Sequence, residues 1–575
     1  MMRIFTLFFL LSGLYSQICL AQSESSKTIF AMPISGVLGT TGSFGEIRSD
    51  HFHSGVDLRT DNKIGKEVRA TQDGYISRIK VSPVGYGKSI FIDHKNGLTT
   101  GYGHLDRYND QINEYVKNVQ YQLKSFDFDV FPKPYELPIK KGDLIGYSGN
   151  SGGSSGPHLH YEVRTTNDQR IINPIPNFLN IVDSIAPIIK SLHIYRIDSE
   201  SYANGYNRKV DFTVFKTKDG YTINSKPNAY GKIGIGIDVF DRLNYLSTQC
   251  GFKSISLAVN GNTIYTLVFD RFAFAETRYV NSIIDYETQY NSGKEIVKLF
   301  VQPANFFSGL RNVIGNGFIS VVPDSTYHIE IFVSDASNNT SKLSFSIKGI
   351  KPIAKHEIKE TKKDQSVFLS YKLNNSIIND TFSLSIPKNS IYDNLYFVYS
   401  TKMLPNFKYS PLIQLHYPQV ALQLKADLKI KAINIPEKYQ SKALLATFDK
   451  KQKIVSAGGE WENGFVSGKI SSFGKYFIAL DTISPEIIPL NVRQDLNMEN
   501  ALSIKLKVTD ELSGIKKING YIDNQWVVFE YDQKNDLIQY YFDKKRLKNN
   551  MNHTLEVILI DAKNNENHFK CNFFW

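Results

Sequence analysis

The apolar residues between about residues 28 and 180 are spaced as in short β-strands joined by tight turns. Asp73-Gly74 and Asn96-Gly97 each separate two short runs rich in Ile, Val, Thr, Tyr and Phe. Asp-Gly and Asn-Gly readily adopt the positive backbone φ that a two-residue hairpin turn requires. The pattern therefore predicts a small antiparallel β domain with a hairpin at each dipeptide.

The stretch from about residue 107 to 138 interrupts this pattern. Residues 111–121 have helical spacing, whereas Phe131-Pro-Lys-Pro favours an extended chain because the residue before a proline avoids the helical region. We interpret the stretch as an insertion containing a short helix. Both of its ends adjoin strands that carry candidate site residues, so we expect it to border the site rather than simply to pack on the domain.

A diverged repeat divides the rest of the chain. Asp-Ser-Ile-Ala-Pro at residues 183–187 returns as Asp-Thr-Ile-Ser-Pro at 481–485, and Asp-Ala-Ser-Asn-Asn at 335–339 returns as Asp-Ala-Lys-Asn-Asn at 561–565. Alternating apolar runs lie between these signatures, with turns spaced as an immunoglobulin-like sandwich requires. Each Asp-Ala-x-Asn-Asn turn supplies one carboxylate, fewer than a tight calcium site uses, so we expect structural turns.

These patterns predict an all-β chain of four parts. The parts are a β domain at 28–180, an immunoglobulin-like β module at 183–350, a β module of uncertain type at 351–480 and an immunoglobulin-like β module at 481–575. Domains with separate cores usually survive cutting at their linkers. We therefore expect the first domain to fold without the later modules.

The first residues have the composition of a secretory signal. Arg3 precedes an apolar run that is too short to cross a bilayer, and Ala21 offers a small residue for cleavage, so we assign residues 1–21 to a signal peptide. Ile18 precedes Cys19 where the lipoprotein pathway uses a small residue, which disfavours a lipid anchor. No later stretch is apolar enough for a membrane span. We expect an exported protein of the periplasm or cell envelope.

Charge and cysteine content narrow the class of protein further. The net charge of +11 and an isoelectric point near 9.0 suit an anionic neighbour such as cell wall or lipopolysaccharide. Nucleic acid is disfavoured because the chain has no dense Lys/Arg block and is expected to be exported. Cys250 and Cys571 lie far apart in different predicted modules, so two buried thiols are favoured over a disulfide bridge.

The candidate chemistry lies in the first domain, in two clusters and one intervening histidine. The clusters are His53-Ser-Gly-Val-Asp57 and His158-Leu-His160, and His104 lies between them in Gly-Tyr-Gly-His-Leu. Imidazole and carboxylate groups are ligands that zinc favours, and a catalytic zinc uses three protein ligands with a fourth position open for water. Five candidate groups therefore leave two beyond the ligands for moving protons.

Strand geometry explains how these groups could meet. His158 and His160 project from the same side of a strand, and so do His53 and Asp57 if that segment is extended. Two adjacent strands would then direct four polar groups at one point. Glu162 lies on the side of His160, where it either orients an imidazole or is a surface carboxylate.

Two further histidines and a glycine-rich run lie nearby. We expect His51 at the rim of the site and His94 in a structural role beside the turn at residues 96–97. Residues 149–156 are rich in glycine and serine but lack the lysine and the following helix of a phosphate-binding loop. We interpret this run as the wall of a groove.

Taken together, the motifs His-x-x-x-Asp, Tyr-x-His-Leu and Gly-x-His-Leu-His resemble the lysostaphin/LytM-type peptidoglycan metallo-endopeptidases. The resemblance covers roughly residues 36–175. It implies a barrel-sandwich β fold and one Zn²⁺ held by His53, Asp57 and His160. It also implies that His104 and His158 lie beside the open position as general base and transition-state partners. The insertion at about 107–138 departs from the compact members of this family.

The resemblance leads to one hypothesis and two rivals. The first is a secreted zinc endopeptidase that binds peptidoglycan peptide stems and hydrolyses the peptide cross-links of peptidoglycan, with β modules that position it on the wall or on a cell-envelope protein. A non-catalytic wall-binding scaffold, or an activator of another hydrolase, is the second, and the intact His53, Asp57 and His160 argue against it. The third is a zinc endopeptidase that acts on proteins, and the site residues alone leave it open.

Overall fold

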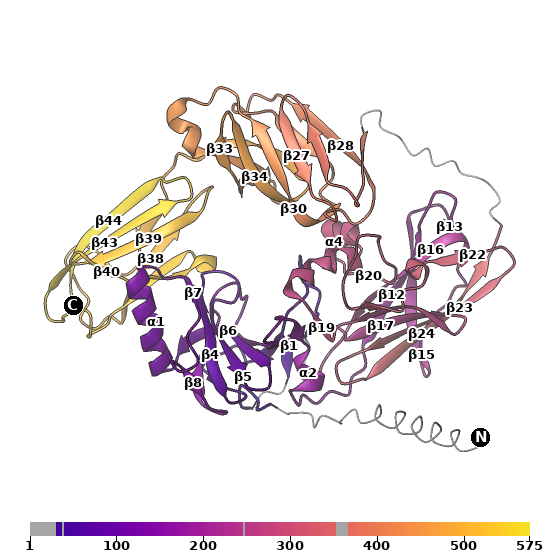
Figure 1. Ribbon diagram of the computed structural model, residues 1–575, viewed down its shortest axis with the longest axis horizontal. Coiled ribbons are helices and arrows are strands. Elements are labelled where there is room, and N and C mark those ends of the chain that lie inside the picture. Colours follow the sequence, from indigo (N-terminus) through magenta and orange to yellow (C-terminus); the bar gives the residue numbers. More distant parts are fainter. Residues whose placement is uncertain (1–29, 37–38, 245–247, 352–365) are drawn as a thin grey trace, which may run out of the picture.

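The computed structural model describes residues 30–36, 39–244, 248–351 and 366–575, and the expected signal peptide with Cys19 lies outside these residues. The described chain is mostly β-structure, as predicted, with a barrel-like sheet in the first part and β-sheet modules after it (Figure 1). No helix in the described ranges is long and apolar enough to cross a bilayer.

The first sheet holds the candidate site residues. Its main path runs β1 (Thr40–Gly42), β2 (Val56–Arg59), β10 (His158–Thr165), β6 (Leu98–Tyr108), β5 (Lys88–His94), β4 (Gly74–Val81) and β7 (Phe128–Val130). Five short strands extend it: β3 (Glu67–Arg69), β8 (Pro138–Ile139), β9 (Leu144–Ser148), β11 (Ile171–Ile172) and β19 (Arg271–Phe272). All pairings in this sheet are antiparallel. β10 pairs with β2 along one edge and with β6 along the other.

One of the two expected hairpins is present. β5 and β6 pair antiparallel across residues 95–97, where Gly97 has a φ of 77°. The hairpin expected at residues 73–74 is wrong, because β3 pairs with β9 instead of with β4. Both edges of β4 are occupied, one by β5 and the other by β7 and β8, so β4 has no free edge for β3.

The predicted helix in the insertion is confirmed. Helix α1 (Asp110–Leu123) begins at Asn109, whose side chain accepts a hydrogen bond from the Ile112 amide. Its buried residues are Ile112, Val116 and Gln120. A short helix α2 (Pro174–Asn177) follows the last strand of this sheet's own segment.

The segment from 188 to 349 forms a second large sheet with a helical excursion. Its strands are β12 (Ile188–Arg196), β13 (Tyr202–Ala203), β14 (Lys209–Thr217), β15 (Gly220–Ile223), β16 (Asn228–Phe240), β17 (Ser254–Val259), β18 (Asn262–Val268), β20 (Val297–Lys298), β21 (Leu310–Arg311), β22 (Ile319–Val321), β23 (Thr326–Ser334) and β24 (Thr340–Gly349). The helical elements are η1 (Phe274–Tyr279), α3 (Val280–Ile283), α4 (Tyr286–Ser292) and η2 (Gly315–Gly317).

Residues 366–480 form a six-stranded and a five-stranded sheet. The six-stranded sheet comprises β25 (Ser366–Leu369), β28 (Leu395–Lys402), β29 (Leu412–Leu415), β35 (Gly474–Leu480), β31 (Ala443–Phe448) and β32 (Ile454–Gly458). The five-stranded sheet comprises β26 (Asn375–Ile378), β27 (Phe382–Ile386), β30 (Ala421–Lys431), β34 (Phe465–Ser472) and β33 (Glu460–Glu462), and η3 (Glu437–Lys442) precedes β31. The two sheets share one hydrophobic core.

The last segment also has two sheets around its own core. One contains β36 (Glu486–Pro489), β38 (Ser503–Thr509), β42 (Leu537–Tyr541) and β41 (Glu530–Asp532), with η4 (Gln533–Asn535) between β41 and β42. The other contains β37 (Leu496–Asn497), β44 (Glu566–Phe574), β43 (Asn552–Asp561), β39 (Ile515–Ile522) and β40 (Gln525–Val527). Cys250 and Cys571 are both buried and free, as expected.

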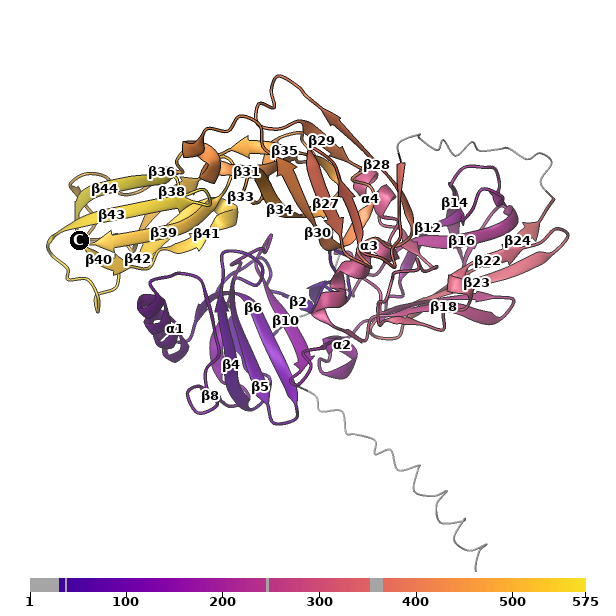
Figure 2. The ribbon, with the colours of Figure 1, turned by 45° about the horizontal axis from the view of Figure 1, so that its top comes forward.

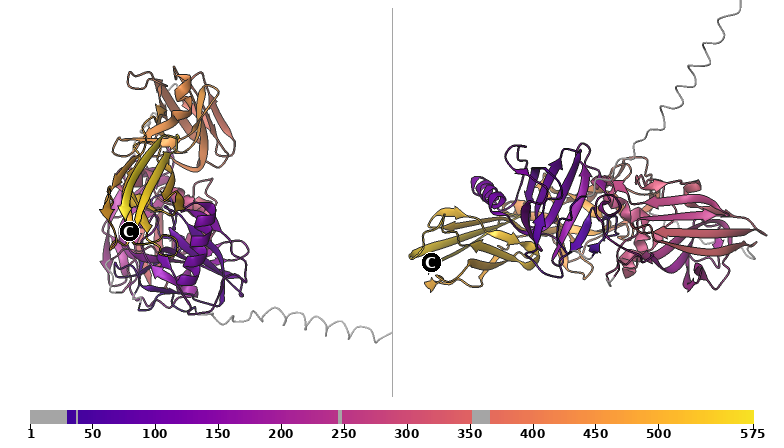
Figure 3. Two further views of the ribbon diagram at one scale, coloured as in Figure 1. Left: turned by 90° about the vertical axis from the view of Figure 1, so that its left-hand side faces the viewer. Right: turned by 90° about the horizontal axis from the view of Figure 1, so that it is seen from below.

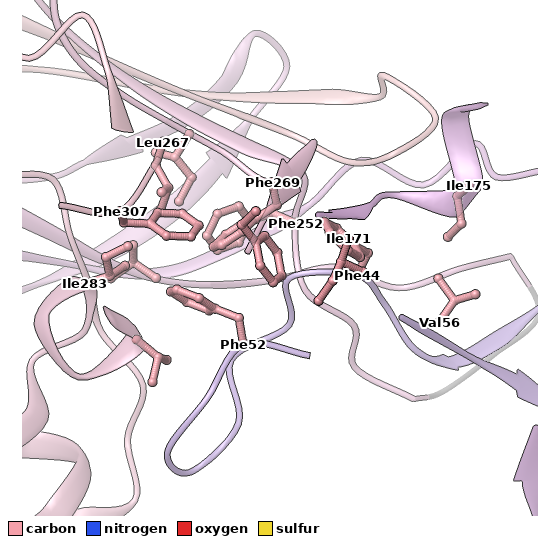
Figure 4. Close-up of a cluster of buried hydrophobic side chains, with 14 of the residues drawn as sticks. Phe44, Phe52, Val56, Ile171, Ile175, Phe252, Leu267, Phe269, Ile283 and Phe307 are labelled. Atoms are coloured by element: carbon pink, nitrogen blue, oxygen red, sulfur yellow. The ribbon is translucent and has the colours of Figure 1, made fainter. Parts of the chain in front are cut away.

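The core of the first domain does not end at residue 183. One cluster of buried side chains extends from Phe30 to Ile347, and Phe52 and Phe307 meet within it with ring centroids 5.0 Å apart (Figure 4). The backbone is continuous there too, since β19 pairs with β11. The expectation that residues 28–180 have a separate core is therefore wrong, because aromatic residues of the next segment complete that core.

The chain also returns to its beginning. The last segment lies beside α1 (Figures 1 and 3), and the four parts follow one another around a ring (Figures 1 and 2). Lys117 Nζ lies 2.9 Å from Asp543 Oδ2, and the rings of Tyr121 and Trp526 meet edge to face at 5.2 Å. The first domain is thus held between the second and the last parts of the chain.

Candidate metal centre

Antiparallel pairing brings the two sequence clusters together. Asp57 on β2 lies opposite His160 on β10, and Gly103 on β6 lies on the other side of His160. His53 precedes β2 instead of lying on it, yet its side chain reaches the same point. A Cβ added to Gly55 would lie 2.8 Å from the His160 ring and 2.5 Å from the Tyr161 carbonyl, so this close approach requires glycine.

Three ligand-type atoms form a nearly equilateral triangle. Asp57 Oδ1 lies 3.0 Å from His53 Nε2 and 3.0 Å from His160 Nδ1, and the two nitrogens are 3.1 Å apart. All three residues are buried, with at most 6% of each exposed. The structure therefore brings together the three residues that we expected to bind metal, at a spacing that one ion can span.

The hydrogen bonds of the rings test whether a metal ion fits. His53 Nδ1 donates to the Ser43 carbonyl at 2.8 Å, which leaves the Nε2 lone pair directed at the triangle. His160 Nε2 is buried, makes no hydrogen bond to a described residue and lies 3.8 Å from Glu162 Oε2. Two ring nitrogens and a carboxylate oxygen therefore face one another at about 3 Å, a spacing that one cation can span. The donor set fits zinc.

Asp57 is held by a cation on its other side. Arg48 Nη2 donates to Asp57 Oδ2 at 3.0 Å and also contacts Glu46 Oε1 at 3.1 Å. Burial alone would raise the pKa of Asp57, but the three surrounding histidines lower it well below its usual range. The carboxylate is therefore ionised and oriented, as a metal ligand must be.

Glu162 is a buried charge behind His160 and not a surface carboxylate. It is fully buried, accepts a hydrogen bond from Arg164 Nη2 and receives the Tyr86 hydroxyl at 3.3 Å. Burial raises its pKa, but Arg164 and His160 outweigh this and lower the pKa to about 2. Burial lowers the pKa of His160, whereas Asp57 and Glu162 raise it to about 9.

His104 and His158 lie beside the triangle with their rings 4.8 Å apart. His104 Nδ1 donates to the Ser151 carbonyl at 2.9 Å, and His158 Nδ1 donates to the Gly156 carbonyl at 2.8 Å. In each ring, Nε2 is therefore left as the atom that can take a proton. His158 Nε2 lies 3.4 Å from Asp57 Oδ1. Burial, with the neighbouring His160 and His158, lowers the pKa of His104 to about 3.

All five candidate residues line one hollow of about 560 Å³. Gly153, Ser154 and Ser155 of the glycine-rich run form part of its wall, as we expected. The lining also includes Phe274, Thr277 and Arg278 of η1, which belong to the following segment of the chain. None of the residues that line the hollow comes from the insertion at 107–138. The expectation that the insertion borders the site is therefore wrong, because α1 packs against the last segment instead.

The remaining predictions and omissions concern single side chains. His51 lies at the rim, half-exposed, and pairs with Asp50 at 2.7 Å. His94 is buried and bonded at both ring nitrogens, to the Asp73 carbonyl and to Thr100 Oγ1, which fits a structural role. Sequence reasoning missed Arg48 and Tyr86, because neither belongs to a motif that identifies a contact made only in the folded chain.

Comparison with known proteins agrees with this geometry. The description "Peptidase family M23" matches residues 51–121 and 135–174, and "Zu5-like domain" matches residues 366–481. DD-carboxypeptidase/endopeptidase Mpg of Neisseria meningitidis serogroup B is 32% identical over 123 residues, which are 21% of this chain and 22% of that protein. Glycyl-glycine endopeptidase ALE-1 of Staphylococcus capitis is 28% identical over 30% of this chain and 39% of that protein.

Solved structures also match part of the chain. The lysostaphin catalytic domain from Staphylococcus simulans is 25% identical, with a TM-score of 0.16, and the match covers 26% of this chain and 86% of that chain. The chain thus spans about a fifth to two fifths of the length of the curated relatives named above. The matched residues include all five candidate site positions. The first part of the chain is therefore similar to peptidase family M23 over residues 51–121 and 135–174.

Proposed function

We propose that the chain is an exported zinc-dependent endopeptidase that hydrolyses peptide cross-links of peptidoglycan. The observation that carries this proposal is the triangle of His53 Nε2, Asp57 Oδ1 and His160 Nδ1, with His104 and His158 beside it. Two relatives are named as endopeptidases, one of them glycyl-glycine specific, which supports a peptide bond as the substrate.

His53, Asp57 and His160 would hold one Zn²⁺ for each chain. Zinc in such a site supplies Lewis acidity that polarises a carbonyl and lowers the pKa of water. The protein residues around it hold the ligands in place. Ser43 fixes the tautomer of His53, Arg48 fixes the orientation of Asp57, and Glu162 lies behind His160.

His104 and His158 would move the proton during peptide hydrolysis. Each ring donates its Nδ1–H to a backbone carbonyl, so Nε2 can accept a proton from the attacking water and return it to the leaving amine. Burial keeps His104 neutral, which is the state that a general base requires. Arg278 also lines the hollow, and its Nε and Nη2 donate to the Leu422 and Ser471 carbonyls, so the module at 351–480 holds this part of the wall.

The β modules would position the enzyme on the wall or on a cell-envelope protein. We assign the modules at 183–350 and 481–575 as immunoglobulin-like, and the third module lies at 351–480. The net charge of +11 favours an anionic wall as the neighbour. The retained set of five site residues is the reason to prefer an enzyme to a non-catalytic scaffold.

Metal content and activity of single variants test the role assignments. We expect His53→Ala, Asp57→Ala and His160→Ala to lose zinc, because a three-ligand site holds its metal weakly with two. We expect His104→Ala and His158→Ala to keep zinc and to lose roughly 10²-fold or more in rate. His94→Ala is the matched control, since it removes a buried imidazole outside the site. Stoichiometric zinc in His160→Ala would contradict the assignment.

The substrate is tested separately. Purified protein is incubated with intact sacculi, with isolated cross-linked muropeptides and with an unfolded protein, each with and without chelator. Chelator-sensitive release of uncross-linked muropeptides is the expected result. Cleavage of the unfolded protein alone would favour a protein-directed endopeptidase, and no cleavage by the zinc-loaded chain would favour the scaffold.

A further inference from the structure

Two groups of three aspartates lie at matching places in the two repeated segments. The first group is Asp183, Asp241 and Asp335, and the second is Asp481, Asp510 and Asp561. Within each group, one carboxylate oxygen of every residue lies within 4.8 Å of the others. The sequence signatures already contained the first and last member of each group, whereas the fold adds Asp241 and Asp510.

Each group forms where strand ends converge at the entrance to a module. Asp241 follows β16 directly, as Asp510 follows β38. Asp335 follows β23, and Asp561 is the last residue of β43. Asp183 and Asp481 each lie where the chain enters the module, so all three carboxylates of a group meet at the same end.

Part of each group serves the backbone. Asp335 Oδ1 accepts hydrogen bonds from the amides of Ser337 and Asn339, and Asp561 Oδ1 does the same with Lys563 and Asn565. These bonds shape the two Asp-Ala-x-Asn-Asn turns, as the sequence indicated. Asp183, Asp481 and Asp510 also accept hydrogen bonds from backbone amides. These backbone contacts use only some of the carboxylate oxygens.

The added aspartates leave buried oxygen atoms without a hydrogen bond. Asp241 is 3% exposed, and its Oδ1 has no partner among the described residues. Asp183 Oδ2 and Asp510 Oδ1 are likewise buried and unpartnered within the described chain. No described Lys, Arg or His forms an ion pair with any of the six carboxylates. Three clustered carboxylates without a cation repel one another at a high cost in a buried place.

The first group also adjoins a small pocket. This pocket of about 20 Å³ is lined by two of the three aspartates, Asp183 and Asp241, together with Thr40 and Ser43 of the first domain. That volume suits one water-sized occupant.

From these observations we propose that each aspartate triad binds one calcium ion. The ligands are carboxylate oxygens alone, which hard divalent cations prefer, and no imidazole or thiolate that would favour zinc joins either triad. A calcium ion would tie the entering chain at Asp183 or Asp481 to the turn at the far strand end. It would thereby fix the orientation of each module relative to the preceding part of the chain.

Binding is tested on the full zinc-loaded chain in calcium-free buffer. Terbium luminescence, sensitised by nearby tyrosines, reports occupancy, and calcium then competes. We expect two ions for each chain, a calcium dissociation constant of about 10⁻⁴–10⁻³ M and weaker competition by magnesium. At ten times that constant, calcium should raise the melting temperature by about 2–4 °C.

Variants assign the two ions. Asp241→Asn and Asp510→Asn should each remove one ion, and the double variant should lose both ions and the calcium-dependent rise in melting temperature. Asp219→Asn is the control, because Asp219 lies on an exposed turn of the module at 183–350. This variant should keep both calcium ions. Asparagine has the same shape as aspartate and carries no charge, so it removes the repulsion between carboxylates. In calcium-free buffer, the double variant should therefore be at least as stable as the parent chain.

Three outcomes would overturn the proposal. They are no terbium or calcium response at about ten times the upper expected constant, an unchanged response in the double variant, or competition by magnesium as strong as that by calcium. The zinc centre is not involved in this readout, so failure of the calcium sites and failure of the proposed peptidase function are distinguishable.

Discussion

The first domain contacts its neighbours through two junctions of opposite chemistry. Against the second segment, Phe44 and Phe52 lie among Phe269, Phe272 and Phe307, and a strand pairing continues the sheet. Against the last segment, ion pairs and hydrogen bonds around α1 and the glycine-rich wall surround one aromatic contact, between Tyr121 and Trp526. Apolar burial is insensitive to salt, whereas exposed ion pairs contribute little and are screened. The first junction is therefore part of the folded core, and the second is a separable contact.

Truncation should give the largest difference between the junctions. A chain ending at residue 181 loses the aromatic residues that cover Phe44 and Phe52. Losing the packing around one buried aromatic side chain costs about 3–5 kcal/mol, and the free energy of unfolding of a typical domain is only about 5–15 kcal/mol. We expect it to be insoluble or unfolded. A chain ending at residue 480 should stay folded and keep zinc. Soluble yield, circular dichroism and zinc content are the measurements, and equal folding of both chains would refute the contrast.

A single aromatic substitution should have the next largest effect. Phe52 is fully buried at the apolar junction, so Phe52→Ala should destabilise the first unfolding transition by about 3–5 kcal/mol. Phe131→Ala is the control, because Phe131 is 69% exposed and should change stability by no more than about 0.5 kcal/mol. Denaturant unfolding of both variants checks this. Equal denaturation midpoints for Phe52→Ala and Phe131→Ala would mean that the apolar junction repacks around the missing ring.

The contrast between the junctions shows what the sequence could and could not predict. Alternation along β10 and the spacing of the His-x-x-x-Asp motif predicted that four side chains would meet, and the family resemblance added His104. The structure brings all five together. The aromatic junction was missed because periodicity marks Phe269 and Phe272 as apolar without indicating which surface they cover. The same limit applies to α1, whose helical spacing was evident and whose partner was not.

The site shows the same limit at the level of single residues. Arg48 and Ser43 orient the ligands through contacts that depend on the path of the chain before β2, and no motif contains them. The number of carboxylates at each Asp-Ala-x-Asn-Asn turn was underestimated for a similar reason. The sequence indicated one, whereas three meet there in the folded chain. Asp241 and Asp510 lie about 94 and 51 residues before the turns that they join, at strand ends that only the fold brings close.

A substitution at the polar junction should have a smaller effect than either change above. Lys117→Ala removes the pair with Asp543, both partners being partly exposed, and should cost no more than about 1 kcal/mol. Amide hydrogen exchange in α1 should become faster, and raising the salt concentration should mimic this in the parent chain. Lys63→Ala, an exposed change elsewhere in the first domain, is the control. Salt-independent protection of α1 would mean that the contact is not held by charge.

The smallest effect should come from a polar contact between the last segment and the wall of the site. Lys534 Nζ donates to the Ser154 carbonyl at 2.9 Å, and Ser154 Oγ lies 3.3 Å from His158 Nδ1, so the last segment holds the wall that orients His158. Lys534→Ala should leave zinc content and melting temperature unchanged and lower kcat/KM about two- to fivefold, the equivalent of a weak exposed charge contact. Lys544→Ala, exposed in the same module, is the control. Loss of zinc in Lys534→Ala would mean that the polar junction supports the metal centre itself, and the two junctions would then not differ as argued. An unchanged kcat/KM would mean that the wall of the site keeps its position without the contact from the last segment.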